Sequence, residues 1–167
     1  MYFRNETEAD IPAIRALVSE AFAGKAYSSQ TEAAIVDALR TNGTLSVSLV
    51  AEDESGIIGH IAFSPVTIDG DDLRWYGLGP IAVTPARQCQ GIGSALLCEG
   101  LAAIRKLGAR GCVLVGEPSY YGRFGFSADG RLRFAGAPPQ YFQVLSFNGD
   151  MPSGTVTYDV AFEATNE

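Results

Sequence analysis

Residues 78–94 read LGPIAVTPARQCQGIGS. The first six are mostly apolar and typical of a strand, and a short loop with Gly91 and Gly93 then opens directly into a helical pattern. Glycine allows a sharp backbone turn and lets a ligand approach without a Cβ in the way. The free N–H groups at a helix start point at one spot, and the helix dipole favours an anion there. The stretch therefore predicts a loop that holds a phosphate.

Two details limit this interpretation. A Gly-x-Gly before a helix also fits a tight turn with close helix packing, and the loop has neither the Gly-Lys-Ser/Thr ending of a P-loop nor the third glycine of a dinucleotide fingerprint. Within the strand, Gly79-Pro80 is discordant, because proline removes a ladder donor and glycine loosens the strand. The pair predicts a bulge, which can re-aim backbone groups beside a site.

The segments on both sides complete an α+β pattern. Asp69-Gly70 is a hairpin signal, so the strands before and after it belong to an antiparallel meander. The helix between residues 73–83 and the wholly apolar strand 112–115 implies a parallel crossover. We therefore expect a central, twisted sheet of mixed antiparallel and parallel strands flanked by helices. The expected strands are 2–5, 45–51, 57–68, 73–83, 112–115, 141–147 and 155–162; the expected helices are 11–22, 32–40, 91–107 and a short turn at 120–124.

Composition indicates one globular domain over residues 1–167. The length suits a single domain, and 47% apolar residues are enough for a real core. Nineteen acidic against twelve basic residues give a net charge of −7. This balance argues against a nucleic-acid partner, which needs clustered Lys and Arg, and it favours cationic partners.

The cysteines and the N-terminus indicate a cytoplasmic location. Cys89, Cys98 and Cys112 are an odd number and form no Cys-x-x-Cys pair, so a disulfide framework and a structural zinc site are not expected. The N-terminus is polar within four residues, which argues against a signal peptide. No run of about 18 apolar residues occurs, so we expect neither a membrane span nor a membrane partner.

A second motif, GEPSYYGRFGF, occupies residues 116–126. With Gln88, Gly91 and Gly93 it resembles the GNAT superfamily of acyl-CoA-dependent N-acetyltransferases. The signature of that family is Gln/Arg-x-x-Gly-x-Gly/Ala, followed by an aromatic–Tyr pair four residues ahead of Gly-Phe, here Tyr120-Tyr121 and Gly125-Phe126. The sequences of residues 78–83 and 121–126 are most similar to those of the YhbS-like predicted acetyltransferases. The resemblance covers about residues 1–130 and leaves residues 131–167 as a variable C-terminal part of the domain.

The resemblance implies a GNAT-type acyl-CoA N-acyltransferase fold, with acetyl-CoA as the acyl donor and no metal. Tyr121 then occupies the position of the residue that protonates the departing thiolate, and the bulge near Gly79 admits the thioester. Arg87 and Gln88 flank the pyrophosphate of coenzyme A. The main chains of Ile81 and Val83 pair with the pantetheine arm as an added strand would. The full set of implied cofactor-binding residues is Ile81, Ala82, Val83, Arg87, Gln88, Cys89, Gln90, Gly91, Ile92, Gly93 and Ser94.

The reaction also needs a general base, for which the sequence offers several candidates. An amine of lysine type has a pKa of about 10.4, so something must take its proton. Residues 78–83 contain no acid or histidine, unlike family members that carry a glutamate on the central strand. Glu117 and His60 are the side-chain candidates, and a water relay is equally compatible. A hydrogen-bonded strand histidine and a helix-start acid are the competing structural roles for His60 and Glu117, as a buried core position is for Tyr121.

The expected reaction is direct transfer of an acetyl group to a primary amine in a ternary complex. A covalent intermediate on Cys89 is disfavoured, because no histidine partner is identifiable near it. The acceptor is a small-molecule or peptide amine that the sequence does not identify. The C-terminal third forms either the acceptor cleft or the interface of a homodimer. The alternatives are a non-catalytic acyl-CoA-binding or sensor domain and a phosphate-binding domain unrelated to coenzyme A.

Overall fold

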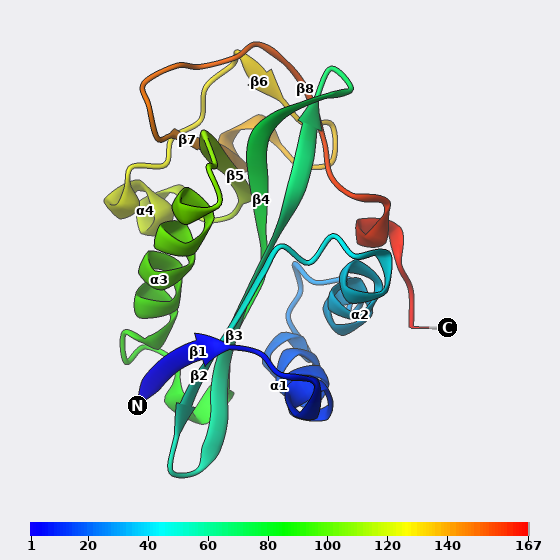
Figure 1. Cartoon of the computed structure of the whole chain (residues 1–167), viewed down its shortest axis with the longest axis vertical. Helices are drawn as coiled ribbons and strands as arrows, with labels where there is room; N and C mark the ends of the chain where they lie inside the picture. The colour runs from blue at the N-terminus through cyan, green and yellow to red at the C-terminus, as the bar shows by residue number, and fades with distance from the viewer. Residues whose placement is uncertain (167) are drawn as a thin grey trace.

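One mixed sheet organises the chain (Figure 1). The computed structural model describes residues 1–166, and their strands run in the order β1-β2-β3-β4-β5-β7, with β8 pairing with both β3 and β6. Neighbours are antiparallel except for the parallel pairs β4–β5 and β6–β8. The strands are β1 Tyr2–Asn5, β2 Val47–Asp53, β3 Gly56–Ile68, β4 Asp71–Val83, β5 Gly111–Val115, β6 Leu132–Arg133, β7 Phe142–Ser146 and β8 Gly154–Thr157.

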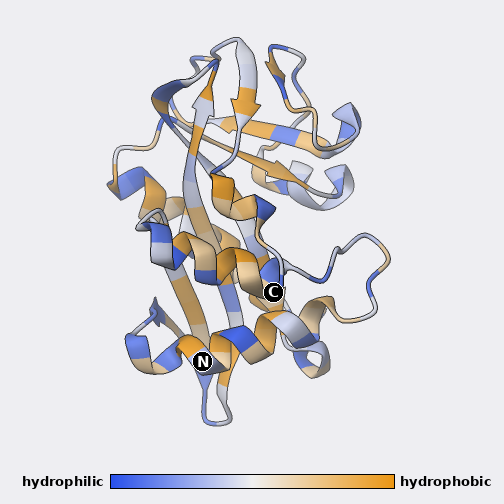
Figure 2. Ribbon diagram, turned by 90° about the vertical axis from the view of Figure 1, so that its right-hand side faces the viewer, coloured by the Kyte–Doolittle hydropathy of each residue, from blue (hydrophilic) through white to orange (hydrophobic). Residues whose placement is uncertain are grey.

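Helices lie on both sides of the sheet, which confirms the predicted fold class. Figure 1 shows α1 (Ile11–Phe22) and α2 (Glu32–Asn42) on one side, and α3 (Ile92–Lys106) and α4 (Pro118–Tyr121) on the other. Apolar residues recur along α1 at the three- and four-residue spacings that a buried helix face requires. The members that are buried are Ile14, Leu17, Val18 and Ala21. Seen from the α1 and α2 side, the strands behind the helices carry hydrophobic segments between paler and hydrophilic ones (Figure 2).

The two faces of the sheet carry separate core clusters. Ile61 and Phe63 of β3 pack with Leu96 and Ile104 of α3. Val50 of β2 and Ala82 of β4 instead pack with α1. A third cluster joins β3, β4 and β5 to the C-terminal strands β6, β7 and β8. None of the helices formed by residues 1–166 is long and apolar enough to cross a membrane.

The predicted bulge occurs at Gly79-Pro80. Leu78 lies opposite Phe63 and Ile81 lies opposite Ile61, so three steps along β4 match two steps along β3. One extra residue in a strand shifts the alternation of side chains. As a result, Leu78 and Ile81 both pack on the α3 side, although their odd spacing would put them on opposite faces of a regular strand.

β4 and β5 separate beyond a short parallel ladder. Their pairs are Trp75↔Gly111, Tyr76↔Cys112 and Gly77↔Val113. The six residues 78–83 of β4 continue past this point without a partner in β5. We call the end of this ladder, at Gly77 and Val113, the apex of the splay.

The C-terminal part differs from the expectation in two places. The strand predicted over residues 155–162 ends at Thr157, and a 3₁₀ helix occupies Val160–Glu163. The cause is local: the Asp159 side chain accepts a hydrogen bond from the N–H of Ala161 at 2.9 Å, which caps a helical turn. The short strand β6 has no counterpart in the prediction. The last residue of the predicted domain 1–167 lies outside the described residues.

Candidate functional site

The predicted phosphate loop leaves its backbone donors open. Gly91 precedes α3 in the left-handed conformation, at φ 83°, and Cys89 is also left-handed at φ 63°. The first bond that involves the helix runs from the N–H of Ala95 to the carbonyl of Gly91 at 3.0 Å. No backbone acceptor within residues 1–166 meets the six N–H groups of residues 89–94. Free donors at a helix start, with the dipole behind them, make an anion site.

Arg87 and Gln88 hold the loop in place. Gln88 donates from Nε2 to the carbonyl of Val83 at 3.0 Å, which ties the loop to the end of β4. Arg87 pairs through Nη1 with Asp53 in the hairpin between β2 and β3, at 2.5 Å, and its Nε donates to the side chain of Gln90. The Ser55 hydroxyl and Arg87 together lower the pKa of Asp53 to about 2. Asp53 therefore stays charged and offsets part of the positive charge of Arg87.

The register of β4 decides which of its main-chain groups face the splay. The N–H of Thr84 donates to the carbonyl of Ile58, so Val83 is in a non-hydrogen-bonded pair with Gly59. Val83 and Ile81, two residues earlier, therefore direct their main-chain groups away from β3 and toward the splay. Ala82 lies between them in a hydrogen-bonded pair with His60, so its main-chain groups bond to β3. Its side chain is buried on the α1 side. The main-chain groups of Ile81 and the N–H of Val83 are therefore free to bind a ligand, whereas the main-chain groups of Ala82 are not.

Tyr121 is the side chain that the second motif brings to this region. Its ring stacks on Tyr120 with centroids 4.9 Å apart and meets Phe126 edge-on at 6.1 Å. The ring also rests on the backbone of Gly116, where a Cβ would lie 2.3 Å from Cε2 of Tyr121. Burial, followed by the neighbouring phenols of Tyr120 and Tyr27, raises the pKa of Tyr121 to about 12. The phenol is therefore neutral throughout the physiological range.

Two contacts that the sequence did not reveal hold the second motif in place, one to the first motif and one to β7. The hydroxyls of Ser94, in the first turn of α3, and Tyr120, in α4, lie 2.8 Å apart. Buried Gln143 of β7 donates from Nε2 to the carbonyl of Gly116 at 2.9 Å and so fixes the segment on which Tyr121 rests. Gln143 belongs to the variable part of the chain, and no local pattern there marks it. For Ser94, the sequence predicted a role for the backbone N–H only, and not this contact of the side-chain hydroxyl.

The structure does not bring His60 to this region. Its side chain is fully buried on the α1 side of the sheet, with Nε2 2.7 Å from the hydroxyl of Ser48. Burial lowers the pKa of His60 to about 4; Glu6 opposes this shift and Arg40 adds to it. A fully buried, neutral imidazole whose Nε2 already bonds to Ser48 cannot meet an acceptor, so the structure gives no support to His60 as the base. Glu117 precedes α4, is exposed, and accepts a hydrogen bond from Ser119 at 3.3 Å.

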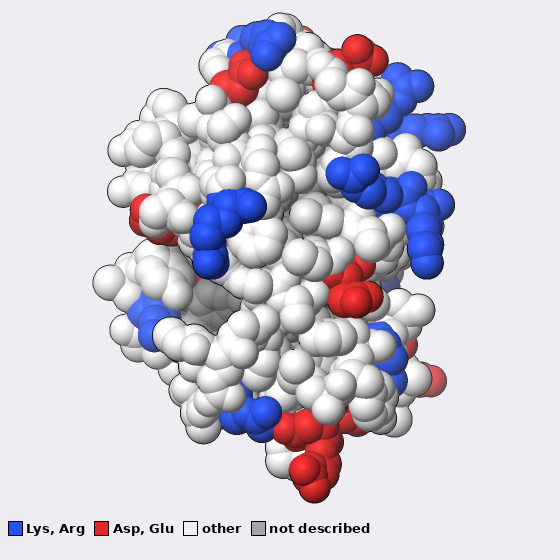
Figure 3. All heavy atoms as spheres, turned by 90° about the vertical axis from the view of Figure 1, so that its left-hand side faces the viewer, with Lys and Arg blue, Asp and Glu red and all other residues white. Residues whose placement is uncertain are grey.

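The face that carries α3 and α4 is hollowed, and Lys and Arg side chains lie above and below the hollow (Figure 3). Arg123 lies over the ring of Tyr120 in α4, at 4.7 Å from its centroid. An anion can therefore meet positive charge here although the net charge of the chain is −7. No group of three His, Cys, Asp or Glu side chains that could hold a metal occurs in the described part of the chain.

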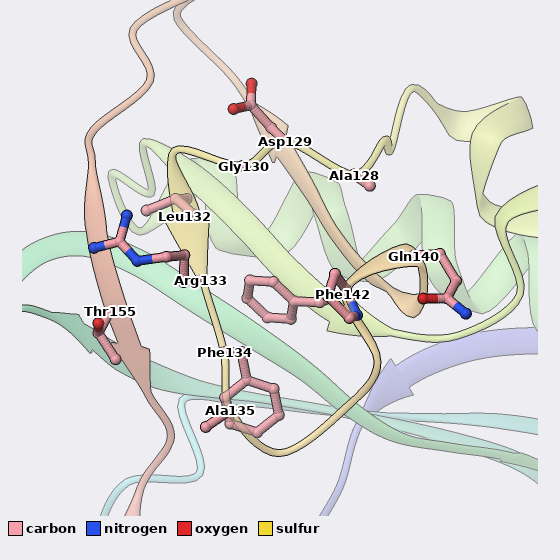
Figure 4. A pocket seen from close by; sticks show the side chains of 11 residues that line it. Ala128, Asp129, Gly130, Leu132, Arg133, Phe134, Ala135, Gln140, Phe142 and Thr155 are labelled. Atoms are coloured by element: carbon pink, nitrogen blue, oxygen red, sulfur yellow. The ribbon is translucent and has the colours of Figure 1, made fainter.

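A separate cavity of about 750 Å³ lies in the C-terminal part, between β6, β7 and β8 (Figure 4). The rings of Phe134 and Phe142, with centroids 5.3 Å apart, form its apolar wall, and Asp129, Arg133 and Thr155 are at its margin. None of the residues predicted for the site lines this cavity. It is therefore distinct from the region that the two motifs form.

Comparison with known proteins agrees with these two motifs. Residues 2–128 match the family described as the acetyltransferase (GNAT) domain. The N-acetyltransferase YhbS of Escherichia coli is 38% identical over 159 residues, which are 92% of each chain. The crystal structure of a GNAT family acetyltransferase from Brucella melitensis in complex with acetyl-CoA is 51% identical, with a TM-score of 0.87, and covers 96% of this chain and 97% of that one.

The structure of YhbS from Escherichia coli in complex with CoA also has a TM-score of 0.87, at 36% identity, and covers 97% of this chain and 91% of that one. These relatives span nearly the whole chain, and the matched residues 2–128 contain both motifs. The strand order, the splay of β4 from β5 and the loop before α3 agree with that assignment. The chain is a member of the GNAT acetyltransferase family.

Proposed function

We propose that the protein transfers an acetyl group from acetyl-CoA to a primary amine by direct attack in a ternary complex. One observation carries the proposal: the open loop before α3, the unpaired edge of β4 and the neutral phenol of Tyr121 lie around one region. The relatives from Brucella melitensis and Escherichia coli, whose crystals contain acetyl-CoA and CoA, support the choice of donor.

The chain's own residues fit that donor. The N–H groups of residues 89–94 would bind the pyrophosphate. Arg87 and Gln88 would act mainly by fixing the loop, since both side chains already bond to other parts of the protein. The open main-chain groups of Ile81 and the N–H of Val83 would pair with the pantetheine amides, which are themselves donors and acceptors. Ala82 would not take part in this pairing, because its main chain is bonded to β3.

In the transfer, the amine nitrogen bonds to the thioester carbonyl carbon and the carbonyl electrons move to oxygen. Their return breaks the carbon–sulfur bond, and the products are the amide and the free thiol. Tyr121 donates a hydrogen bond to the departing sulfur. A thiol has a pKa of about 8.5, below the value of about 12 for Tyr121, so Tyr121 stabilises the thiolate mainly by hydrogen bonding, and solvent completes its protonation.

For the proton that the amine loses, we propose water in the cleft. Residues 78–83 carry no acidic or imidazole side chain, and His60 is buried on the other face. Glu117 is the remaining side-chain candidate, and its exposure at the start of α4 is compatible with a helix-start acid. The acceptor is a small-molecule or peptide amine, and the acidic balance of the chain favours a cationic one.

The experiment is an amine panel with detection of thiol release, on the native protein and on Tyr121→Phe. We expect the substitution to lower kcat by about 10²-fold, the lower end of the loss seen when one hydrogen-bond donor to a developing negative charge is removed. The dissociation constant of acetyl-CoA, measured by calorimetry, should stay nearly unchanged, because the phenyl ring keeps its packing on Gly116. Unchanged turnover would remove Tyr121 from the mechanism.

A second function, a non-catalytic acyl-CoA-binding domain, is favoured by one observation. No acid or histidine lies on the open part of β4, and the only histidine of the chain is inaccessible. The same panel separates the two. Binding of acetyl-CoA with no thiol release across chemically diverse amines would establish the binding domain. Failure to bind CoA would contradict both functions.

A further inference from the structure

Two hydroxyl groups are buried without a hydrogen-bond partner near the apex of the splay. They belong to Tyr158 and Ser64, and neither finds a donor or acceptor within residues 1–166. Ser64 lies opposite Gly77 in the ladder between β3 and β4. Gly77 is also the last residue of β4 that pairs with β5. The ring of Tyr158 covers Gly77, where a Cβ would lie 2.6 Å from Cε2 of Tyr158.

The C-terminal segment holds the Tyr158 ring firmly at this place. Tyr158 follows β8, whose residues Val156 and Thr157 pair with the end of β3. Its ring packs against Phe134, with centroids 5.0 Å apart, and against Phe162, at 4.9 Å. The variable part of the chain therefore delivers one polar atom to the point where β4 and β5 separate.

Ring packing alone does not explain a tyrosine at this position. A buried hydroxyl without a partner lost its bonds to water on folding and gained none in return, which destabilises the fold. Phenylalanine would keep the contacts with Phe134 and Phe162 and avoid this loss. A ligand that supplies the missing partner would account for the hydroxyl.

The proposed cofactor site brings a suitable partner to the apex, and this step rests on the proposed function. From Val83 to Leu78 the open edge of β4 spans five residue-to-residue steps, about 16 Å at 3.3 Å per step. An extended pantetheine arm that starts at the loop before α3 and follows this edge ends near Gly77. Burial raises the pKa of Tyr158, so its hydroxyl keeps its proton and can act as a donor.

We propose that the hydroxyl of Tyr158 donates a hydrogen bond to the carbonyl oxygen of the acyl thioester, as a catalytic residue in addition to Tyr121. When the amine attacks, the new carbon–nitrogen bond moves the carbonyl electrons onto this oxygen, and the bond from Tyr158 strengthens. When the electrons return and the carbon–sulfur bond breaks, Tyr158 has neither lost nor gained a proton. The C-terminal third thus shapes the catalytic cleft.

The test is Tyr158→Phe, with binding of acetyl-CoA and of CoA measured separately by calorimetry. Only acetyl-CoA has the carbonyl, so we expect its dissociation constant to rise about 3- to 10-fold, the range of one neutral hydrogen bond, and that of CoA to stay the same. With an acceptor from the panel, kcat should fall about 10-fold or more, since the oxyanion benefits most. The melting temperature of the ligand-free variant should be equal to or above that of the native protein.

Tyr2→Phe is the matched control, because Tyr2 is exposed on the edge strand β1 and bonds to Glu52. It should change neither dissociation constant. Equal weakening of both ligands by Tyr158→Phe, or no change in either, would overturn the inference, as would an acetyl-CoA complex in which a water joins Tyr158 to Ser64 and the acyl oxygen lies elsewhere. If the native protein binds neither ligand, the proposed function fails. If the native protein binds both ligands and Tyr158→Phe changes neither dissociation constant, the proposed function stands but the contact with Tyr158 does not.

Discussion

His60 couples the stability of the fold to pH. Its unfolded pKa is about 6.5, and burial lowers the folded value to about 4. Below pH 6.5 the imidazole of His60 binds a proton in the unfolded chain but stays neutral in the folded chain, so acid favours unfolding. We expect the free energy of unfolding to fall between pH 6.5 and 4 by up to about 3 kcal/mol from this residue, at about 1.4 kcal/mol per pKa unit, and to level off below pH 4. Urea unfolding at pH 7 and 4.5 measures the loss.

The control for this residue is His60→Gln, which keeps a polar side chain near Ser48 but does not titrate. Carboxylates with lowered pKa values, such as Asp10 beside Arg4, weaken the fold in acid in both proteins. The difference between native and variant therefore isolates the imidazole. If both proteins lose the same free energy between pH 7 and 4.5, His60 is not held neutral by the fold.

At the scale of the element, α4 is placed by the absence of a side chain at Gly116. A Cβ there would lie 2.3 Å from the Tyr121 ring, closer than real atoms approach, so Gly116→Ala must displace the ring. We expect kcat to fall about 10-fold or more, because small displacements of a catalytic group are costly. Overpacking should also lower the free energy of unfolding by about 1–3 kcal/mol. Steady-state kinetics and urea unfolding check both.

Gly122→Ala is the control for α4. A Cβ at Gly122 meets nothing within 4 Å, and the residue has an ordinary φ of −57°. This substitution lies next to Tyr121 in sequence but leaves its ring in place. We expect kcat and stability to stay close to native values. An equal loss in both variants would mean that α4 tolerates no alanine at all, and the contact with Gly116 would lose its special role.

Elements with a local cause were predictable from sequence. The bulge at Gly79-Pro80 and the open loop before α3 follow from what proline and glycine do to their own backbone. The predicted strand 155–162 was wrong beyond Thr157, because one capping bond from Asp159 outweighs an apolar pattern. The main-chain bonds of Ala82 have a different cause, because only the register against β3 tells which main-chain groups of β4 are free.

Residues whose roles depend on distant partners were not predictable. Gln143 acts on Gly116 from 27 positions away, and Tyr158 reaches Gly77 from 81 positions away. No periodicity or motif connects such pairs. The two motifs were therefore recognisable from sequence, whereas the residues that pack against them from the C-terminal part needed the fold.

At the scale of the whole molecule, the family-like part and the variable part share one core. β7 pairs with β5 over five residues and so covers what would be an edge of the sheet. Val66, Trp75 and Val113 from the first part are buried against the second part. The buried residues that the second part contributes are Leu132, Phe142, Val144 and Val156. The division at residue 130 describes where the motifs end, not where the fold ends.

A chain truncated after residue 130 should therefore not fold cooperatively. Burying four apolar side chains contributes about 6 to 12 kcal/mol, at about 1.5–3 kcal/mol each, which is comparable to the whole stability of a typical domain, about 5–15 kcal/mol. The truncation also exposes the edge of β5, which can then pair with another chain and promote aggregation. A chain ending at Glu163 keeps β6, β7, β8 and the last 3₁₀ helix and should unfold in a single transition. Circular dichroism during urea unfolding compares the two, and a cooperative transition in the shorter chain would show that residues 1–130 form an independent core.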